Sequence, residues 1–352
     1  MKPDSEDYDL IYLHTKMELE KLRDKKIFLT GGTGFVGLWL LHFFQWANEN
    51  HATNIKLDIL ARTPDKLKEL VPYLWNDPRF QFFSGDIRSF SFPMKKFDYV
   101  IHAAATAAHD TYNHIGKVES FNIVSEGTHR LLDFVVASQS GPVLYLSSGA
   151  CYGARAQSAP FIREDSKLKP ALNEPNSGLG LGKRAAEDYC EEYRKSYGLD
   201  IKIARCFTFM GPFLPVRIHY AIGNFIFSGV ENRKIVLKSS GGAFRSYMYS
   251  ADLVAWLIKI LITGKDGSIY NVGSEKLISI KDLATTVGKV IGPDVTIEVP
   301  QNSQEDVPSY YIPDTSKIRS ELMVSEWTSL EDGIRKSKSH FEKNKEAYLT
   351  RI

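Results

Sequence analysis

The chain has 352 residues, of which 43% are hydrophobic and 24% are charged, a composition typical of an ordinary globular protein. Because single hydrophobic cores rarely grow beyond about 250 to 300 residues, this length predicts one large domain or two coupled ones. The formal net charge is +2, from 44 basic and 42 acidic residues, and so small a charge gives no large field to attract nucleic acid. The composition therefore favours a small-molecule partner.

The sequence does not indicate export, membrane insertion or metal binding. No apolar run approaches the roughly 20 residues needed to cross a bilayer, and the N-terminal segment MKPDSEDYDL lacks the basic start and apolar stretch of a secretory signal. The cysteines are too few and too scattered for a disulfide framework or a zinc site. They are Cys151, Cys190 and Cys206. We expect a soluble, cytoplasmic protein with no metal and no membrane partner.

Residues 1–25 are expected to form a helical leader ahead of the main fold. Apolar side chains recur there at near-helical spacing, which is typical of an amphipathic helix. They are Leu10, Ile11, Leu13, Met17, Leu19 and Leu22. We expect this helix to serve in packing.

Residues 26–208 alternate between strand-like and helix-like segments. The strand-like segments are IFLT, IKLDILA, FQFFSGDI, FDYVIHAAA and PVLYLSS, and the apolar segment GFVGLWLLHFFQWA follows the first of them. Such alternation predicts an α/β fold of the Rossmann type, a doubly wound parallel sheet with helices on both faces. Residues 209–352 are less regular. We expect them to form mainly a smaller, discontinuous α/β substrate domain, with some segments returning to the first domain.

The segment TGGTGFVG follows the strand IFLT directly and opens an apolar helix, which is the context that a dinucleotide-binding glycine motif requires. Gly31 permits the tight turn, Gly34 lets the backbone approach the pyrophosphate, and Gly37 lets the helix and strand pack closely. The helix N-terminus adds N–H groups and the positive end of the helix dipole. We therefore predict that this turn binds a dinucleotide. The other residues expected to contact it here are Thr33, Phe35 and Val36.

The end of the second strand leaves the choice between NAD and NADP open. In IKLDILARTPDK, Asp58 lies within the strand, whereas Ala61 and Arg62 occupy its tip. An acidic residue at the tip would bond the ribose hydroxyls of NAD, and an arginine there suits the 2′-phosphate of NADP. The position of Arg62 slightly favours NADP(H). The alternatives are NAD(H) bound through Asp58 and a solvated loop role for Arg62.

Two further strand ends are expected to border the dinucleotide. Asp86 follows the third strand in SGDI, where its carboxylate would accept a hydrogen bond from the adenine amino group or, alternatively, cap the next helix. The fourth strand ends in three alanines, whose small side chains let a cofactor lie close to the backbone. The expected contact residues here are Asp86, Ile87, Ala103, Ala104 and Ala105.

Eight segments of this chain together resemble the extended short-chain dehydrogenase/reductases, a family of nucleotide-sugar epimerases, dehydratases, decarboxylases and 4-keto reductases. In the family's order and approximate spacing they are TGGTGFVG, GDI, VIHAAA, YLSSGACYG, GKRAAE, ARCFTFMGP, GNFI and RSYMYSADL. The resemblance covers nearly the whole chain after the leader. It implies NAD(P)(H) as cofactor, a nucleoside-diphosphate sugar as substrate, and a homodimer that pairs two helices of each subunit, here around 118–138 and 180–197.

The resemblance also implies a catalytic set of Ser or Thr, Tyr and Lys. The serine maps to Ser148, and the lysine maps to Lys183, which would also orient the nicotinamide ribose. The tyrosine should lie four residues before the lysine, where this chain has Leu179. A phenol at that spacing would share a helix face with the ammonium group, which would lower the phenol pKa for proton transfer. Leucine cannot transfer a proton.

Another side chain would therefore have to carry the proton. Tyr152 is the first candidate because the motif sets it near Ser148, and packing is its alternative role. The remaining candidates are Cys151, His102, His109 and His219. In an apolar strand, His102 is expected to be a satisfied core histidine.

The type of reaction is narrowed by the residues that follow Ser148. The 4,6-dehydratases carry an acidic pair there, whereas this chain has Gly149 and Ala150. Elimination by the usual route would lack its acid and base. The resemblance therefore favours 4-epimerisation or 4-keto reduction.

Two residues of the second half map to substrate contacts of the family. Asn224 in GNFI corresponds to an amide that contacts the nucleoside diphosphate, and Arg245 in RSYMYSADL corresponds to an arginine that pairs with the pyrophosphate. A guanidinium group suits that bidentate task. The alternative roles are a helix cap for Asn224 and a surface position for Arg245. Asp252 is expected to cap the helix ADLVAWLIKIL.

Three functional hypotheses follow. The first is an NAD(P)-dependent enzyme that oxidises or reduces C4 of a nucleotide-activated sugar, with Ser148 polarising that oxygen. Leu179 motivates the second, a catalytically silent dinucleotide-binding relative with a regulatory or structural role. Arg62 motivates the third, an NADPH reductase of another carbonyl metabolite.

Overall fold

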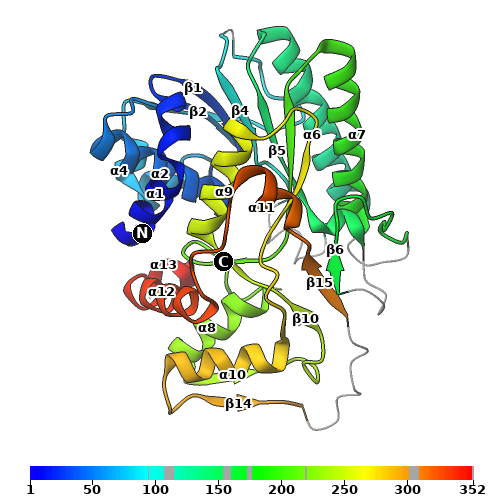
Figure 1. Ribbon diagram of the computed structural model, residues 1–352. Coiled ribbons are helices and arrows are strands. Elements are labelled where there is room, and N and C mark those ends of the chain that lie inside the picture. The colour runs from blue at the N-terminus through cyan, green and yellow to red at the C-terminus, as the bar shows by residue number, and fades with distance from the viewer. Residues whose placement is uncertain are drawn as a thin grey trace.

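The computed structural model describes residues 1–93, 95–106, 115–153, 160–172, 177–218, 220–300 and 309–350. Its centre is a seven-stranded parallel sheet in the order β12-β7-β5-β4-β1-β2-β3 (Figure 1). The strands are β1 (Lys26–Thr30), β2 (Lys56–Ala61), β3 (Phe80–Ser84), β4 (Tyr99–His102), β5 (Val143–Ser148), β7 (Ile201–Cys206) and β12 (Ile269–Val272). The strand order reverses between β1 and β4, which is the switch point of a doubly wound sheet. The predicted fold class is confirmed.

Helices cover both faces of this sheet, because parallel strands with apolar side chains on both sides must be buried on both sides. On one face lie α2 (Phe35–His51) and α9 (Ser250–Thr263), and on the other lie α6 (Lys117–Ser138) and α7 (Ser177–Tyr197) (Figure 1). Each pair of helices shares a separate buried apolar cluster with the strands. The short helices α3 (Lys66–Leu70) and α4 (Pro72–Trp75) connect β2 to β3.

The expected leader helix is α1 (Ser5–Leu22), which packs against α9. Its apolar stripe differs from the predicted one, since Leu13 is 60% exposed and Met17 is 78% exposed. The backbone of Thr15 has non-helical angles, φ −130° and ψ 16°, so side chains before and after it do not follow one regular stripe. The predicted residues Ile11, Leu19 and Leu22 are buried, together with Tyr8, which was not predicted.

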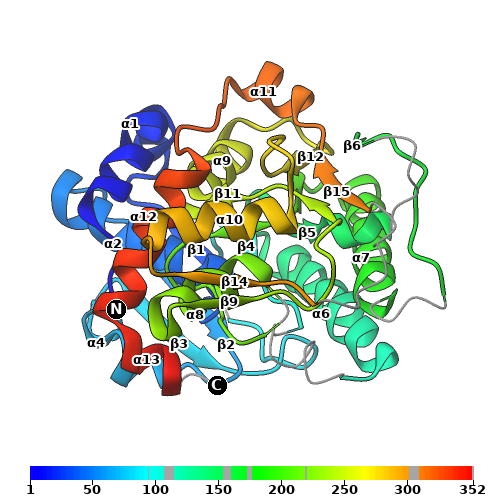
Figure 2. The same cartoon turned by 90° about the horizontal axis from the view of Figure 1, so that it is seen from below.

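The later part of the chain forms smaller sheets and helices, which lie below the large sheet in Figure 1 and face the viewer in Figure 2. A four-stranded sheet has the order β13-β10-β15-β6, built from β13 (Ile278–Ser279), β10 (Phe244–Arg245), β15 (Tyr310–Pro313) and β6 (Phe161–Ile162). Two strand pairs are β8 (Phe209–Met210) with β11 (Met248–Tyr249) and β9 (Lys234–Val236) with β14 (Thr296–Glu298). Three helices pack together beside them, namely α8 (Ala221–Asn232), α10 (Ile280–Ile291) and α12 (Leu330–Lys343).

The chain after residue 209 also returns to the large sheet. Strand β12 forms one of its edges, α9 packs on one of its faces, and α11 (Ser316–Leu322) packs beside β12. The last helix is α13 (Lys345–Thr350), and a 3₁₀ turn, η1 (Gly149–Tyr152), follows β5. The domain boundaries stay a prediction. Among the described helices, none has the length and apolar character needed to cross a membrane.

Candidate functional site

The turn between β1 and α2 approaches the end of β4 very closely. Gly31 has φ +74°, and a Cβ on it would lie 2.7 Å from the backbone carbonyl of Ala103. A Cβ on Gly37 would lie 2.5 Å from the Cα of Gly32. Real Cβ atoms do not come so near, and φ > 0 is the region that glycine adopts without steric cost. The geometry of these two glycines matches the roles predicted for the tight turn and for close packing.

Gly34 is the N-cap of α2 and is exposed, and no side chain caps this helix end. The N–H groups of the first helical turn have no intrahelical acceptor. Phe35 and Val36 belong to that turn and Thr33 directly precedes the cap; all three are partly exposed. A helix N-terminus of this kind attracts phosphate, so the turn fits a dinucleotide pyrophosphate.

The small residues predicted after β4 lie beside this turn. The N–H of Ala103 donates to the Thr30 carbonyl over 3.2 Å, and the N–H of Ala104 donates to Thr30 Oγ1 over 3.2 Å. Ala103, Ala104 and Ala105 are all partly exposed. The fold therefore brings the glycine turn and the alanine segment together at one strand end.

The two residues expected to distinguish NAD from NADP, Asp58 and Arg62, have different surroundings at the outer strands. Asp58 lies within β2, is 6% exposed, and forms an ion pair of 2.6 Å with Lys95. Burial raises the pKa of Asp58, and the hydrogen bond from Lys95 opposes that rise. Arg62 directly follows β2 and is exposed. Of the two side chains, Arg62 is the one at the strand tip.

Asp86 follows β3, and its carboxylate is held by Arg88. The Arg88 Nε and Nη2 atoms donate to it over 3.0 Å and 2.9 Å, and the Arg88 N–H donates over 2.8 Å. These hydrogen bonds lower the pKa of Asp86. The segment after Asp86 is a turn and not a helix, so the predicted alternative of a helix cap is wrong. Ile87 is buried against Gly127 of α6.

The end of β5 and the start of α7 hold the residues mapped to catalysis. Ser148 ends β5, and its Oγ accepts a hydrogen bond of 3.1 Å from the N–H of Ala150. Lys183 is 4% exposed, and its Nζ donates to the Leu146 carbonyl over 2.6 Å. Burial lowers the pKa of Lys183 to about 8. Leu179 lies one helical turn before Lys183 and packs against the apolar cluster under α6 and α7.

Tyr152, the first candidate for a substitute proton carrier, lies inside the protein. It is fully buried, its hydroxyl donates to Asn271 Oδ1 over 2.9 Å, and it accepts from Arg205 Nη1 over 2.7 Å. Burial raises the pKa of the Tyr152 phenol. Cys151 is fully buried as well. This geometry favours a structural role for Tyr152.

Among the histidine candidates, His102 is a satisfied core residue, as expected. Its Nδ1 lies 2.7 Å from Thr30 Oγ1, and its Nε2 lies 3.1 Å from Thr128 Oγ1. Burial lowers the pKa of His102 to about 3, so the ring is neutral at pH 7. His109 and His219 lie outside the described residues.

Sequence reasoning missed Tyr311, which the fold brings to the serine turn from β15. A Cβ on Gly149 would lie 2.8 Å from Tyr311 Cζ, and the phenol oxygen is nearer still. A phenol hydroxyl therefore lies against Gly149, the residue that directly follows the expected catalytic serine, Ser148. No local pattern around Tyr311 predicts this contact.

The two residues mapped to substrate binding are engaged in local hydrogen bonds. Asn224 Oδ1 accepts from the N–H of Arg217 over 2.5 Å, and its Nδ2 donates to the Ile218 carbonyl. Arg245 Nη1 donates to the carbonyls of Phe244 and Ser309 over 2.7 Å and 3.0 Å. Burial lowers the pKa of Arg245.

The expected cap of α9 is wrong. The N-cap position is Tyr249, and no side chain caps the helix. Asp252 is fully buried, and its carboxylate accepts hydrogen bonds of 3.2 Å from the N–H groups of Trp327 and Thr328. Burial raises its pKa to about 7. Asp252 therefore ties the segment before α12 to α9.

Comparison with known proteins decides the family. Residues 27–273 match the model of the NAD dependent epimerase/dehydratase family. The chain belongs to this family. The match begins at β1 and ends just after β12, so it spans the whole large sheet.

The chain is similar to several members of the family. It is 26% identical over 313 residues to UDP-glucuronic acid decarboxylase 6 of Arabidopsis thaliana, covering 88% of this chain and 86% of that protein. It is 30% identical over 280 residues to the dTDP-D-glucose 4,6-dehydratase of Dictyostelium discoideum, covering 75% and 61%. The structure of a dTDP-glucose 4,6-dehydratase from Streptomyces venezuelae, with NAD and TYD bound, aligns with a TM-score of 0.77 at 22% identity over 93% and 100% of the chains.

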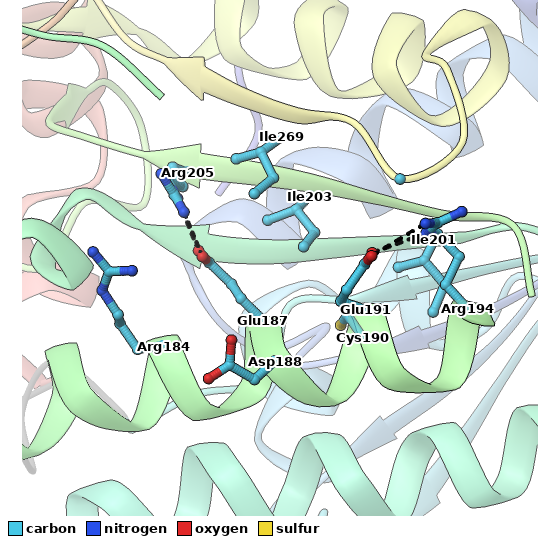
Figure 3. Close-up of a pocket in the computed structure, with 11 residues that line it drawn as sticks. Arg184, Glu187, Asp188, Cys190, Glu191, Arg194, Ile201, Ile203, Arg205 and Ile269 are labelled. Carbon is cyan, nitrogen blue, oxygen red and sulfur yellow. Dashed lines mark hydrogen bonds and ion pairs between the residues drawn. The ribbon is translucent and has the colours of Figure 1, made fainter. Parts of the chain in front are cut away.

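In this family member, a buried ion pair joins α7 to the two strands beside it. Glu187 on α7 points toward Arg205 on β7 (Figure 3), with bidentate contacts of 3.0 Å and 2.6 Å. Ser147, next to Ser148, donates to Glu187 over 2.5 Å. Because these three residues come from α7, β7 and β5, the contacts fix Lys183 relative to the end of β5.

Glu187 and Arg205 also line a hollow of about 350 Å³ between α7 and the edge of the sheet. Glu187, Arg205 and Arg194 are among the residues around it (Figure 3). No residue predicted to bind the dinucleotide or the sugar nucleotide lines it. The hollow is therefore separate from the candidate site.

Proposed function

We propose that the protein is an NAD(P)-dependent enzyme that oxidises or reduces C4 of the sugar in a nucleoside-diphosphate sugar. One observation supports the proposal most strongly. The glycine turn, the alanine segment and the N-terminus of α2 lie at the end of the sheet where β5 ends in Ser148. Ligands of doubly wound sheets bind at this edge, beside the switch point. Family membership and the reactions named for its relatives support the same proposal.

The cofactor site is proposed to use residues already described. The pyrophosphate would lie beside Gly34 on the N–H groups of Phe35 and Val36, and the alanine segment would face the nicotinamide half. When bound, the dinucleotide supplies hydride acceptance and donation. Lys183 would hold the nicotinamide ribose, and Asp86 with Ile87 would border the adenine.

On the substrate side, Ser148 would donate a hydrogen bond to the oxygen at C4 and polarise it. Arg245 and Asn224 would bind the diphosphate. Since burial disfavours the Arg245 cation, a diphosphate beside it would supply the missing counter-charge. Gly149 and Ala150 offer no acid or base for elimination, and their presence favours 4-epimerisation or 4-keto reduction over 4,6-dehydration.

Leu179 favours a second candidate, a catalytically silent relative that binds a dinucleotide. The test is turnover of a panel of UDP-, dTDP-, CDP- and GDP-sugars with NAD(H) and NADP(H). Proton NMR of the sugars is needed because an epimerase shows no net change in the cofactor. We expect conversion of at least one sugar. A protein that binds cofactor and nucleoside diphosphate but converts none of them would favour the silent relative.

Arg62→Ala is expected to weaken NADP(H) binding by about 10- to 100-fold, which corresponds to a charge-assisted contact of roughly 1.5 to 3 kcal/mol. NAD(H) binding should change little, because NAD has no 2′-phosphate for Arg62 to meet. Titration of each reduced nucleotide, followed by its fluorescence, measures both affinities. An equal effect on both would favour NAD. Lys66→Ala, which removes an exposed positive charge from α3, serves as the control.

The protein is also proposed to form a homodimer through α6 and α7. Tyr189 and Tyr197 on α7 and Val118 on α6 are exposed, as expected for helices that meet a second copy. Light scattering at micromolar concentration should give twice the mass of the chain, and Tyr189→Glu should shift it toward the monomer. Leu13→Glu, at an exposed position of α1, should not. A wild-type protein that is wholly monomeric would contradict the proposal.

A further inference from the structure

The phenol of Tyr311 occupies the space that a side chain at position 149, directly after Ser148, would fill. A Cβ there would come within 2.8 Å of Tyr311 Cζ and closer to its oxygen. Any residue larger than glycine would therefore displace the phenol. Gly149 leaves room for a hydroxyl group that belongs to another part of the chain.

The ring of Tyr311 is held in place by packing. Its centroid lies 4.8 Å from that of Phe207, with the planes tilted by 37°. The ring also packs against the small buried cluster that contains Tyr152 and Ile162. Unlike the fully buried Tyr152, Tyr311 is partly exposed. Its position is fixed while a part of the side chain stays open to the surroundings.

The strand pairing sets Tyr311 beside Arg245. The two residues are partners in the parallel register of β10 and β15, so their side chains leave the small sheet on the same face. The charge of an ionised Tyr311 would favour the cationic form of Arg245. The phenol therefore lies against the residue that follows Ser148, and its strand position is paired with the arginine proposed to bind the diphosphate.

We propose that Tyr311 is a catalytic residue that carries the proton in place of the phenol missing at Leu179. The inference rests on the proposed function. In the reductive direction the Tyr311 O–H bond breaks and its proton bonds to the carbonyl oxygen held by Ser148. The carbonyl carbon gains a hydride from the reduced nicotinamide, and water returns a proton to the phenolate. In the oxidative direction the phenolate accepts the proton of the sugar hydroxyl group, and C4 loses its hydride to the oxidised nicotinamide.

The first test is Tyr311→Phe, which keeps the ring and removes only the hydroxyl group. The value of kcat for the sugar converted by the wild type should fall by about 10²- to 10⁴-fold, the range for loss of a general acid or base. Affinities for the dinucleotide and for the free nucleoside diphosphate, measured by calorimetry, should not change. Tyr310→Phe is the matched control, because Tyr310 stacks on Phe244 at 5.1 Å and should keep full activity.

Gly149→Ala is the second test, since its methyl group would push the phenol away without touching its chemistry. It should lower kcat in the wild type and add no further loss in the Tyr311→Phe variant. A Tyr311→Phe enzyme within tenfold of the wild-type kcat would overturn the inference and leave the proposed function intact. Loss of nucleoside diphosphate affinity that matches the loss of activity would also overturn it, in favour of a binding role. A wild type that converts no sugar removes the proposed function and the inference with it.

Discussion

Gly34→Asp is expected to abolish dinucleotide binding without unfolding the protein. The new carboxylate would stand at the N-cap of α2, where aspartate accepts hydrogen bonds from the first N–H groups of a helix. Those are the groups proposed to bind the pyrophosphate, and the added negative charge would repel it. The loss of affinity should exceed about 100-fold, or roughly 3 kcal/mol. Fluorescence titration with NADH and NADPH measures it.

Gly34→Ala is the control for this change. A Cβ at Gly34 would lie 3.3 Å from the carbonyl oxygen of Gly31, a tight contact that a small backbone shift can relieve. Alanine brings no charge, so this variant should lose much less affinity than the aspartate variant. The melting temperature of Gly34→Asp should not fall, because aspartate suits an N-cap. Unchanged affinity in Gly34→Asp would remove the assignment of this turn to the dinucleotide.

Glu187→Ala is expected to lower the free energy of unfolding by about 3 to 5 kcal/mol, the cost of leaving a buried charge without its partner. Arg205 would lose both bidentate contacts while it stays buried, with its side chain 5% exposed. Ser147 would lose its acceptor as well. Urea denaturation followed by circular dichroism gives the change.

A matched surface pair lies on the same helix. Glu191 binds Arg194 with side chains that are 44% and 29% exposed, so Glu191→Ala should cost less than about 1 kcal/mol. If the two variants lose equal stability, the Glu187 contacts do not hold α7 to the sheet as described. A large loss for Glu187 alone supports their role in fixing Lys183 near the end of β5.

The features that could be predicted from the sequence are those that local patterns determine. The apolar strands, the helices between them and the turn at Gly31 and Gly37 depend on residues close together in the chain, and they formed the predicted parallel sheet. The stripe of α1 was predicted less well, because the non-helical backbone at Thr15 breaks its period. The pattern of leucines contains no sign of that break.

Contacts between distant segments could not be predicted in the same way. The motif places Tyr152 near Ser148, but the burial of its hydroxyl group depends on Arg205 from β7 and Asn271 from β12. The approach of Tyr311 to Gly149 likewise depends on how β15 lies against η1. Neither contact has a local pattern, since each requires strands that are far apart in the sequence to be placed first.

The most direct test of the proposed function is proton NMR of the sugar-nucleotide panel after incubation with the wild-type protein and each dinucleotide. We expect at least one sugar to be converted at C4, either to its epimer or between alcohol and ketone, while the nucleoside diphosphate stays intact. No conversion of any sugar would contradict the proposed function, and no binding of any free nucleoside diphosphate would in addition remove the assignment to nucleotide sugars.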